Sequence, residues 1–248
     1  MSKRIKELLS QPGRTFNADE LSALAAYFRI VMFDILHDRG TGHWGGAASS
    51  AELTTALYFN RISIDPSNPR WEDRDRVILS KGHASMNLYT ILAHRGFFPV
   101  EELSSFRKLD SRLQGHPCMN KLPGVDMSTG ALGHGLSVGL GMALAARLSK
   151  KNWWTYVISG EGCLNEGQSW EAIMSAAKYK SEHFVLMIDY NKVQLDGTED
   201  EIMPLGPLAD KLKAFGWNVA PKACNGHDTK EILDSFAWMD RDDVWPKA

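Results

Sequence analysis

The stretch Ser159-Gly160-Glu161-Gly162-Cys163-Leu164-Asn165-Glu166-Gly167 follows directly on an apolar run at residues 153–158. A second apolar run, at residues 184–188, ends in Asp189-Tyr190-Asn191. Short apolar runs bounded by glycine and polar residues are typical of buried parallel strands. Open α/β sheets bind ligands just past the carboxyl ends of such strands, so we expect both polar groups to lie in a ligand site.

The residue types in the two groups predict a site for a diphosphate and a hard cation. Gly160 and Gly162 let the backbone approach a phosphate closely. The Glu161 carboxylate, the Asn191 amide and the main-chain carbonyl of Val193 are oxygen donors of the kind that Mg²⁺ prefers. An acid in a glycine-rich turn, taken alone, is more often solvated. The preceding strand and the 29-residue spacing from Gly162 to Asn191 favour the metal site here.

Composition predicts one α/β domain and excludes several classes of function. The 248 residues are 44% hydrophobic and 23% charged, which is ordinary for a globular domain that buries one sizeable core. The net charge of -2, without a long basic run, argues against nucleic-acid binding. Three cysteines without metal-like spacing, no cleavable leader and no 18-residue apolar span predict a cytoplasmic protein with reduced thiols and no membrane association.

Hydrophobic periodicity predicts alternating helices and strands. Residues 19–36 repeat apolar side chains at helical spacing, and Ser49-Ser50-Ala51-Glu52 resembles a capping box that opens a second helix through Tyr58. The helix at 135–150 is unusually rich in glycine and alanine, which permits close backbone approach. The full expectation is helices at 19–36, 50–58, 83–95, 135–150, 166–179, 207–215 and 228–238, with strands at 76–80, 153–158, 184–188 and 217–219.

This alternation predicts an α/β fold with a doubly wound, mostly parallel sheet flanked by helices. We expect residues 1–248 to form a single diphosphate-binding domain, with an N-terminal helical segment of about residues 1–38 packed on it.

The Gly160-to-Asn191 pattern is similar to the Gly-Asp-Gly…Asn motif of thiamine diphosphate enzymes. Together with further motifs it resembles the amino-terminal subunit of a split transketolase over roughly residues 20 to 235, which implies the thiamine diphosphate-binding fold. The sequence departs from the family pattern at Glu161, where the family has Asp, and at His134, where it usually has Gln. The further motifs are Gly42-His43-Trp44-Gly45-Gly46, Asp73-Arg74-Asp75-Arg76, Ser80-Lys81-Gly82-His83-Ala84, Gly96-Phe97-Phe98-Pro99, Gln114-Gly115-His116-Pro117 and Ser128-Thr129-Gly130-Ala131-Leu132-Gly133-His134-Gly135.

The resemblance implies a role for each matching residue. His83 would contact the diphosphate side of the cofactor, whereas His43 and His116 would line the substrate funnel. The loop through Gly130 and Leu132 would wrap the cofactor. The site residues that it implies are, as catalytic, His43, His83, His116 and Glu166; for the cofactor, His83, Gly130, Leu132, Gly160, Glu161, Gly162 and Asn191; and for Mg²⁺, or Ca²⁺ or Mn²⁺ in its place, Glu161, Asn191 and Val193.

A partner subunit is also implied. In the resembled family the glutamate that activates thiamine diphosphate belongs to a separate pyrimidine-binding domain, which no stretch of this sequence matches. Glu166 would lie near the subunit interface and stabilise the partner's catalytic carboxylate, although it also suits a helix cap or a surface acid. The family continues beyond the position of Ala248 with another strand and a substrate-contacting histidine, so either a tail is missing or the protein is shortened.

The predicted function is therefore that of one subunit of a two-component transketolase. Working with a pyrimidine-binding C-terminal subunit in a heterotetramer or larger assembly, it would transfer a two-carbon ketol unit between a ketose and an aldose, as phosphates or analogues. Two alternatives stay open: a subunit of another thiamine diphosphate-dependent carboligase or 2-oxo acid enzyme, and a non-catalytic assembly partner whose cofactor binding is weakened by Glu161. The donor and acceptor sugars do not follow from the sequence.

Overall fold

The computed structural model describes residues 1–11, 13–241 and 244–248 and divides into two compact units. Unit 1 comprises Met1–Glu72, His83–Ser128 and Cys224–Asp240, and unit 2 comprises Asp73–Gly82, Thr129–Ala223 and Arg241–Ala248. The single domain with a packed N-terminal segment stays a prediction. No helix in the described ranges is long and apolar enough to cross a membrane.

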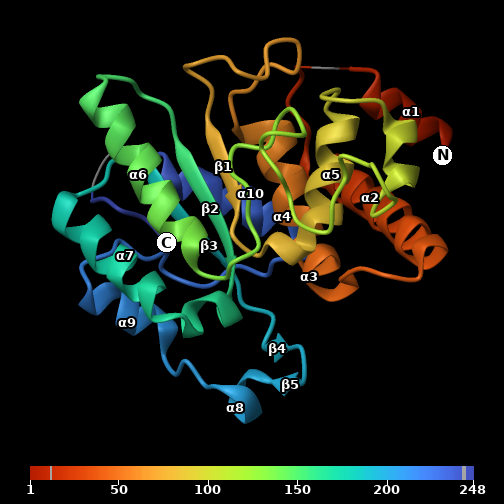
Figure 1. The fold of residues 1–248 in the computed structure, drawn as a ribbon. Helices are drawn as coiled ribbons and strands as arrows, with labels where there is room; N and C mark the ends of the chain where they lie inside the picture. The colour runs from red at the N-terminus through yellow and green to blue at the C-terminus, as the bar shows by residue number, and fades with distance from the viewer. Residues whose placement is uncertain (12, 242–243) are drawn as a thin grey trace. The chain divides into compact units, whose positions relative to one another are not determined.

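Unit 1 is helical (Figure 1). The long helix α2 begins at a capping box, in which the Asn17 side chain accepts from the Glu20 N–H and the Glu20 carboxylate accepts from the Asn17 N–H. It ends at Gly40 in the left-handed conformation. The described helices of unit 1 are α1 (Lys3–Leu9), α2 (Ala18–Arg39), α3 (Trp44–Ser49), α4 (Ala51–Ala56), a π-helical turn (Leu57–Arg61), α5 (Ser85–His94), a 3-10 helix (Val100–Ser105) and α10 (Thr229–Met239).

A half-buried histidine packs against aromatic rings in unit 1. His94, at the end of α5, packs against the rings of Tyr27 and Phe28 on α2, with ring centroids 5.5 and 4.8 Å away. Its Nδ1 lies 2.8 Å from the Thr90 carbonyl oxygen. Burial lowers the pKa of His94, and the Thr90 carbonyl opposes that shift.

The predicted capping box at residues 49–52 is wrong. Helix α4 begins at Ala51, but the Ser50 hydroxyl donates back to the Gly46 carbonyl instead of capping α4. The Glu52 carboxylate is buried and forms a two-point ion pair with Arg29 of α2, and His227 lies beside the pair. Glu52 thus forms a charge-assisted pair with Arg29 instead of the predicted capping hydrogen bond.

Unit 2 contains a parallel sheet in the order β1-β2-β3, formed by Arg76–Leu79, Thr155–Gly160 and Phe184–Asp189. The register pairs Leu79 with Ile158, and Gly160 with Asp189. The predicted α/β fold with a parallel sheet flanked by helices is confirmed, and the strands at 76–80, 153–158 and 184–188 lie within two residues of their expected bounds.

Helix α6 (His134–Leu148) lies along one face of this sheet, next to α7 (Gly167–Tyr179) (Figure 1). Its glycines are what allow this approach. A Cβ at Gly139 would lie 2.5 Å from Cγ2 of Val157, and one at Gly135 would lie 2.5 Å from Oγ of Ser80. Gly141, on another side of α6, meets nothing within 4 Å.

The remainder of unit 2 follows β3. A small antiparallel hairpin, β4 (Val193–Gln194) and β5 (Gly197–Thr198), leads into α8 (Glu199–Ile202), and α9 (Leu208–Ala214) comes later. The hairpin and α8 were not predicted. The strand expected at 217–219 is reduced to a single bridge, in which Asn218 pairs with Lys247, and Lys247 also pairs with Val185 of β3.

Candidate functional site

The loops after β2 and β3 bring the predicted metal donors together. Glu161 begins the 3-10 helix Glu161–Asn165 directly after β2, and its side chain is buried. Among the described residues, its Oε1 has no hydrogen-bond partner. Burial raises the pKa of the Glu161 carboxyl, and the charge of Asp189 adds to the shift. Backbone N–H groups of Glu161, Asn191 and Val193 oppose the shift, so the carboxylate faces the loop after β3.

Asn191 lies in a tight turn after β3. Its Oδ1 accepts the N–H of Val193 at 2.9 Å, and Lys192 between them has φ +61°. Its Nδ2 lies 3.5 Å from Oδ2 of Asp189. The amide of Asn191 and the backbone of Val193 are therefore held in one compact turn, next to the carboxylate of Glu161.

An ion pair between a buried lysine and a half-buried aspartate lies at the same edge of the sheet. Lys81, two residues past β1, is 2% exposed, and its Nζ donates to Oδ2 of Asp189 at 2.5 Å. Burial lowers the pKa of Lys81, whereas Asp189, Cys163 and Glu161 raise it. Lys81 thus compensates the charge of Asp189, which lies beside Glu161.

The residues present fit a diphosphate with a hard cation. A buried carboxylate oxygen without a partner is costly unless a positive group approaches it, and Mg²⁺ would supply that group. Gly160 and Gly162 have no positive φ, and a Cβ on either would meet the nearest side chain only at 3.9 or 3.7 Å. The fold itself therefore does not require glycine at 160 and 162, whereas a closely bound phosphate would.

The loop before α6 is fixed to α7 by a residue that we did not predict. Nε2 of Gln168 donates to the Leu132 carbonyl at 3.0 Å and lies 2.8 Å from Nδ1 of His134. Gly130, with φ +158°, precedes this contact, and a Cβ at Gly82 would lie 2.8 Å from the Gly130 nitrogen. The predicted cofactor loop through Gly130 and Leu132 is thus packed between the end of β1 and the start of α7.

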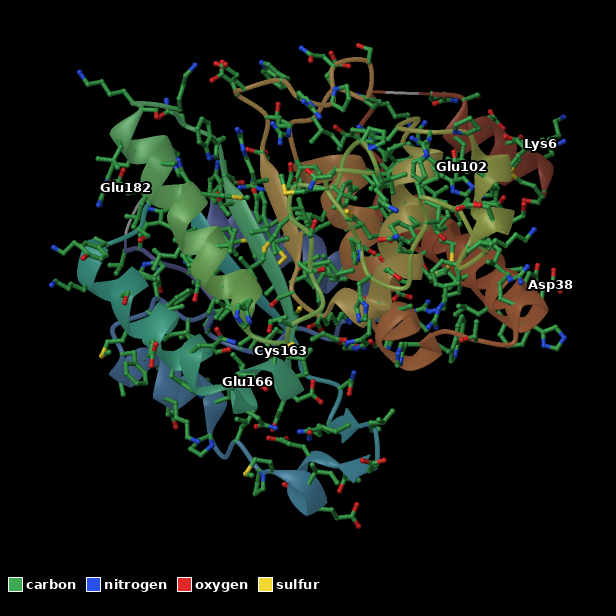
Figure 2. All side chains as sticks on the ribbon, in the orientation of Figure 1. Lys6, Asp38, Glu102, Cys163, Glu166 and Glu182 are labelled. Carbon is green, nitrogen blue, oxygen red and sulfur yellow. The ribbon has the colours of Figure 1, made fainter. Side chains whose placement is uncertain are left out.

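Glu166 is exposed at the start of α7, close to Cys163 (Figure 2). It occupies the N-cap position, yet its side chain makes no capping hydrogen bond. The capping interpretation therefore does not account for this acid.

The three predicted histidines belong to unit 1. His43 is exposed at the N-terminus of α3, and its ring centroid lies 5.3 Å from that of the half-buried His83. A Cβ at Gly46 would lie 3.1 Å from Nε2 of His83, so a glycine is what lets α3 pack against this ring. His116 is exposed in the loop after Gly115. The structure brings the rings of His43 and His83 together.

Sequence reasoning missed three residues that organise the site: Lys81, Gln168 and Glu199. Lys81 stood in the quoted Ser-Lys-Gly-His motif, but a lysine in a loop suggests a solvated charge until its burial is known. Glu199 is 3% exposed and accepts hydrogen bonds from Tyr190 Oη at 2.5 Å and from the Leu205 N–H at 2.8 Å. These bonds lower the pKa of Glu199, and the carboxylate raises the pKa of Tyr190 to about 12.

Comparisons with known proteins agree on one family. The family model for the transketolase thiamine diphosphate binding domain matches residues 21–243. The 6-deoxy-6-sulfo-D-fructose transketolase subunit SqwG of Clostridium sp. (strain MSTE9) is 43% identical over 216 residues, which are 87% of this chain and 78% of that protein. An apulose-4-phosphate transketolase subunit of Phocaeicola vulgatus is 40% identical over 212 residues, covering 86% of this chain and 74% of that protein.

Solved structures give the same result. The transketolase of Campylobacter jejuni superposes with a TM-score of 0.87 at 30% identity, over 94% of this chain and 37% of that one. The transketolase of Leishmania mexicana gives 0.88 at 27% identity, over 94% and 36%. The chain thus spans about a third of the length of these solved transketolases. The predicted transketolase-like transferase is confirmed, and the chain belongs to the transketolase family, whose thiamine diphosphate binding domain it contains.

Proposed function

We propose that this chain is the diphosphate-binding subunit of a two-component transketolase that moves a two-carbon ketol unit from a ketose to an aldose. The observation that carries the proposal is the buried, unpartnered Oε1 of Glu161 next to the turn of Asn191 and Val193. Two relatives that are named as transketolase subunits support the two-component arrangement. We infer assembly with a second protein that carries a pyrimidine-binding domain, as a heterotetramer.

In the proposed site, Glu161, the Asn191 amide and the Val193 carbonyl would hold Mg²⁺, or Ca²⁺ or Mn²⁺ in its place. Gly160, Gly162 and the loop through Gly130 and Leu132 would line the cofactor, and His83 would donate to its diphosphate. Bound thiamine diphosphate would supply an electron sink for cleavage of the C–C bond beside the substrate carbonyl.

The remaining residues would handle substrate and protons. His43 and His116 are exposed imidazoles, which donate to sugar hydroxyls and exchange protons near neutral pH. Glu166 would stabilise the catalytic carboxylate of the partner subunit.

The proposed substrates are ketoses that carry an anionic group. The names of the two relatives specify a sulfonated ketose and a sugar phosphate, so the two substrates share a sugar with a terminal anion. We place the protein in carbohydrate metabolism and in the cytoplasm, where the free thiols of Cys118, Cys163 and Cys224 would stay reduced.

Calorimetry and a ketol-transfer assay test this function together. We expect thiamine diphosphate to bind in a Mg²⁺-dependent way when the partner subunit is present, and ketol transfer to require both subunits. Transfer by this chain alone would contradict the partner requirement. Mg²⁺-dependent binding with turnover of 2-oxo acids, but not of ketoses, would instead favour the carboligase alternative. No binding under any condition would favour the non-catalytic assembly partner.

Gly162→Ala separates the cofactor from the fold. Because a Cβ at this position meets nothing closer than 3.7 Å, the variant should melt at the temperature of the parent. A phosphate close to the backbone would collide with the added methyl group, so cofactor affinity should fall at least tenfold. Unchanged affinity would remove Gly162 from the site.

A further inference from the structure

The segment after β3 is tied to one acid at two points on either side of Asn191. Tyr190, immediately before Asn191, donates its hydroxyl to Oε2 of Glu199 at 2.5 Å. Lys192, immediately after Asn191, accepts at its carbonyl the backbone N–H of Glu199 at 3.1 Å. Glu199 therefore holds both neighbours of the residue that we assign to the metal.

The acid itself is well anchored. Glu199 begins α8, which lies beside the hairpin β4–β5 (Figure 1), and its second oxygen accepts the N–H of Leu205 at 2.8 Å. The side chain is 3% exposed. A buried carboxylate costs free energy unless it is hydrogen-bonded, and both oxygens of Glu199 are.

We infer that Glu199 is a positioning residue for the proposed metal site, which sets the place of Asn191 and Val193 without touching the cation. The inference rests on the proposed function, because it assigns these two residues to the metal. Residues that orient metal ligands from a second layer often affect metal affinity nearly as much as the ligands themselves. The hairpin and α8 would then have a structural role: they return the chain so that Glu199 lies beside the turn that holds Asn191.

Three variants of the full chain test the inference. Glu199→Ala removes both side-chain hydrogen bonds, and Tyr190→Phe removes the hydroxyl alone. Asp200→Ala is the matched control, because it removes the same charge from the exposed neighbouring position on α8. Each variant is assembled with the partner subunit. Binding of Mn²⁺ with thiamine diphosphate is measured by electron paramagnetic resonance, and amide hydrogen exchange of residues 190–205 is measured without cofactor.

We expect Glu199→Ala to lower the Mn²⁺ and cofactor affinity about 10- to 100-fold, in the range for residues that orient metal ligands. Tyr190→Phe should lower it less, and Asp200→Ala should match the parent. Exchange at residues 190–205 should accelerate in the same order, while the β2 and β3 amides keep their protection.

Two results would overturn the inference alone: parent-like affinity of Glu199→Ala, or unchanged exchange at 190–205. If Glu199→Ala unfolds globally, Tyr190→Phe decides the test. Affinity and hydrogen exchange equal to those of the parent in Tyr190→Phe would then overturn the inference. If the parent itself binds no Mn²⁺ with thiamine diphosphate, the proposed function fails, and the positioning role fails with it.

Discussion

The two units present their proposed functional residues in different ways. In unit 2, the donors around Glu161 and Asn191 are buried or tied into a hydrogen-bonded turn, with a neutralised acid at Asp189 beside them. In unit 1, His43 and His116 are exposed on short connecting segments. A group that must bind one cofactor benefits from preorganisation, whereas groups that meet a changing series of sugars benefit from freedom to adjust. Substitutions of the unit 2 donors should therefore change cofactor binding, and those of His43 and His116 should change turnover.

The largest expected effect is at Glu161. Glu161→Ala should abolish Mg²⁺-dependent binding of thiamine diphosphate in the assembled complex, because it deletes the buried carboxylate. Glu161→Asp keeps the charge and restores the side chain of the family pattern, and should tighten binding by about 1 kcal/mol if glutamate is strained there.

Calorimetry measures both variants, with Glu182→Ala as the control because Glu182 is an exposed acid of the same unit (Figure 2). Weaker binding by the Asp variant would mean that the loop has adapted to glutamate. Equal affinity for parent, Asp and Ala would remove Glu161 from the site.

The packing beneath the site comes next. Gly139→Ala places a methyl group 2.5 Å from Val157 at the α6–sheet contact, and should lower the free energy of unfolding by about 1–3 kcal/mol. Gly141→Ala on the same helix has open space and should raise it by up to about 1 kcal/mol. Chemical denaturation of the two variants decides the matter, and equal stabilities would contradict the close packing of α6.

Smaller effects are expected in unit 1. His43→Ala and His116→Ala should each lower kcat/KM for the ketose about tenfold, the equivalent of one hydrogen bond, while cofactor affinity stays near that of the parent. His83→Ala should weaken cofactor binding as well. Steady-state kinetics with parallel calorimetry separate the two effects. Parent-like behaviour of all three variants would leave these histidines a structural role and break the contrast between the units.

The smallest effect concerns His94, which is half-buried in unit 1. Its pKa is lowered in the folded state, so below its ordinary value of about 6.5 the unfolded chain binds a proton that the folded chain does not. Stability contributed by neutral His94 is thus present above this pH and is lost as the pH falls.

We expect the loss of unfolding free energy between pH 7.5 and pH 5.5 to be smaller in His94→Gln than in the parent. Urea denaturation at both values measures it, and the interval from pH 7.5 to pH 8.5 is the control. Identical losses in parent and variant would exclude His94 as a source of the pH dependence.

Local patterns predicted what local physics controls. The apolar runs predicted β1, β2 and β3, and the glycine-rich segment at 135–150 predicted α6. Strand burial and close helix packing depend on residues that are neighbours in the sequence. The predicted capping box was wrong because Glu52 pairs with Arg29, which lies 23 positions earlier. Local sequence rules do not predict such a distant pair.

Part of the candidate site could also be predicted from the sequence. Glu161, Asn191 and Val193 could be assigned from spacing and resemblance, because strand ends at one sheet edge must be neighbours. Lys81 could not be placed beside Asp189, since 108 positions separate them and the pairing depends on the register of the sheet. Glu199 was hidden for another reason: a two-residue hairpin strand leaves too short a pattern to show that the chain turns back.

The donor set after β2 and β3 has a thermodynamic consequence. Among the described residues, no three His, Cys, Asp or Glu side chains gather in a way that could hold a metal ion. Mg²⁺ takes six oxygens, so three donors from this chain would leave the other positions to the diphosphate and water. Metal and cofactor would then each raise the affinity for the other by the same factor, because linkage is reciprocal. The fraction of the chain with both ligands bound would depend on the concentrations of metal and cofactor together. A high concentration of one would compensate for a low concentration of the other.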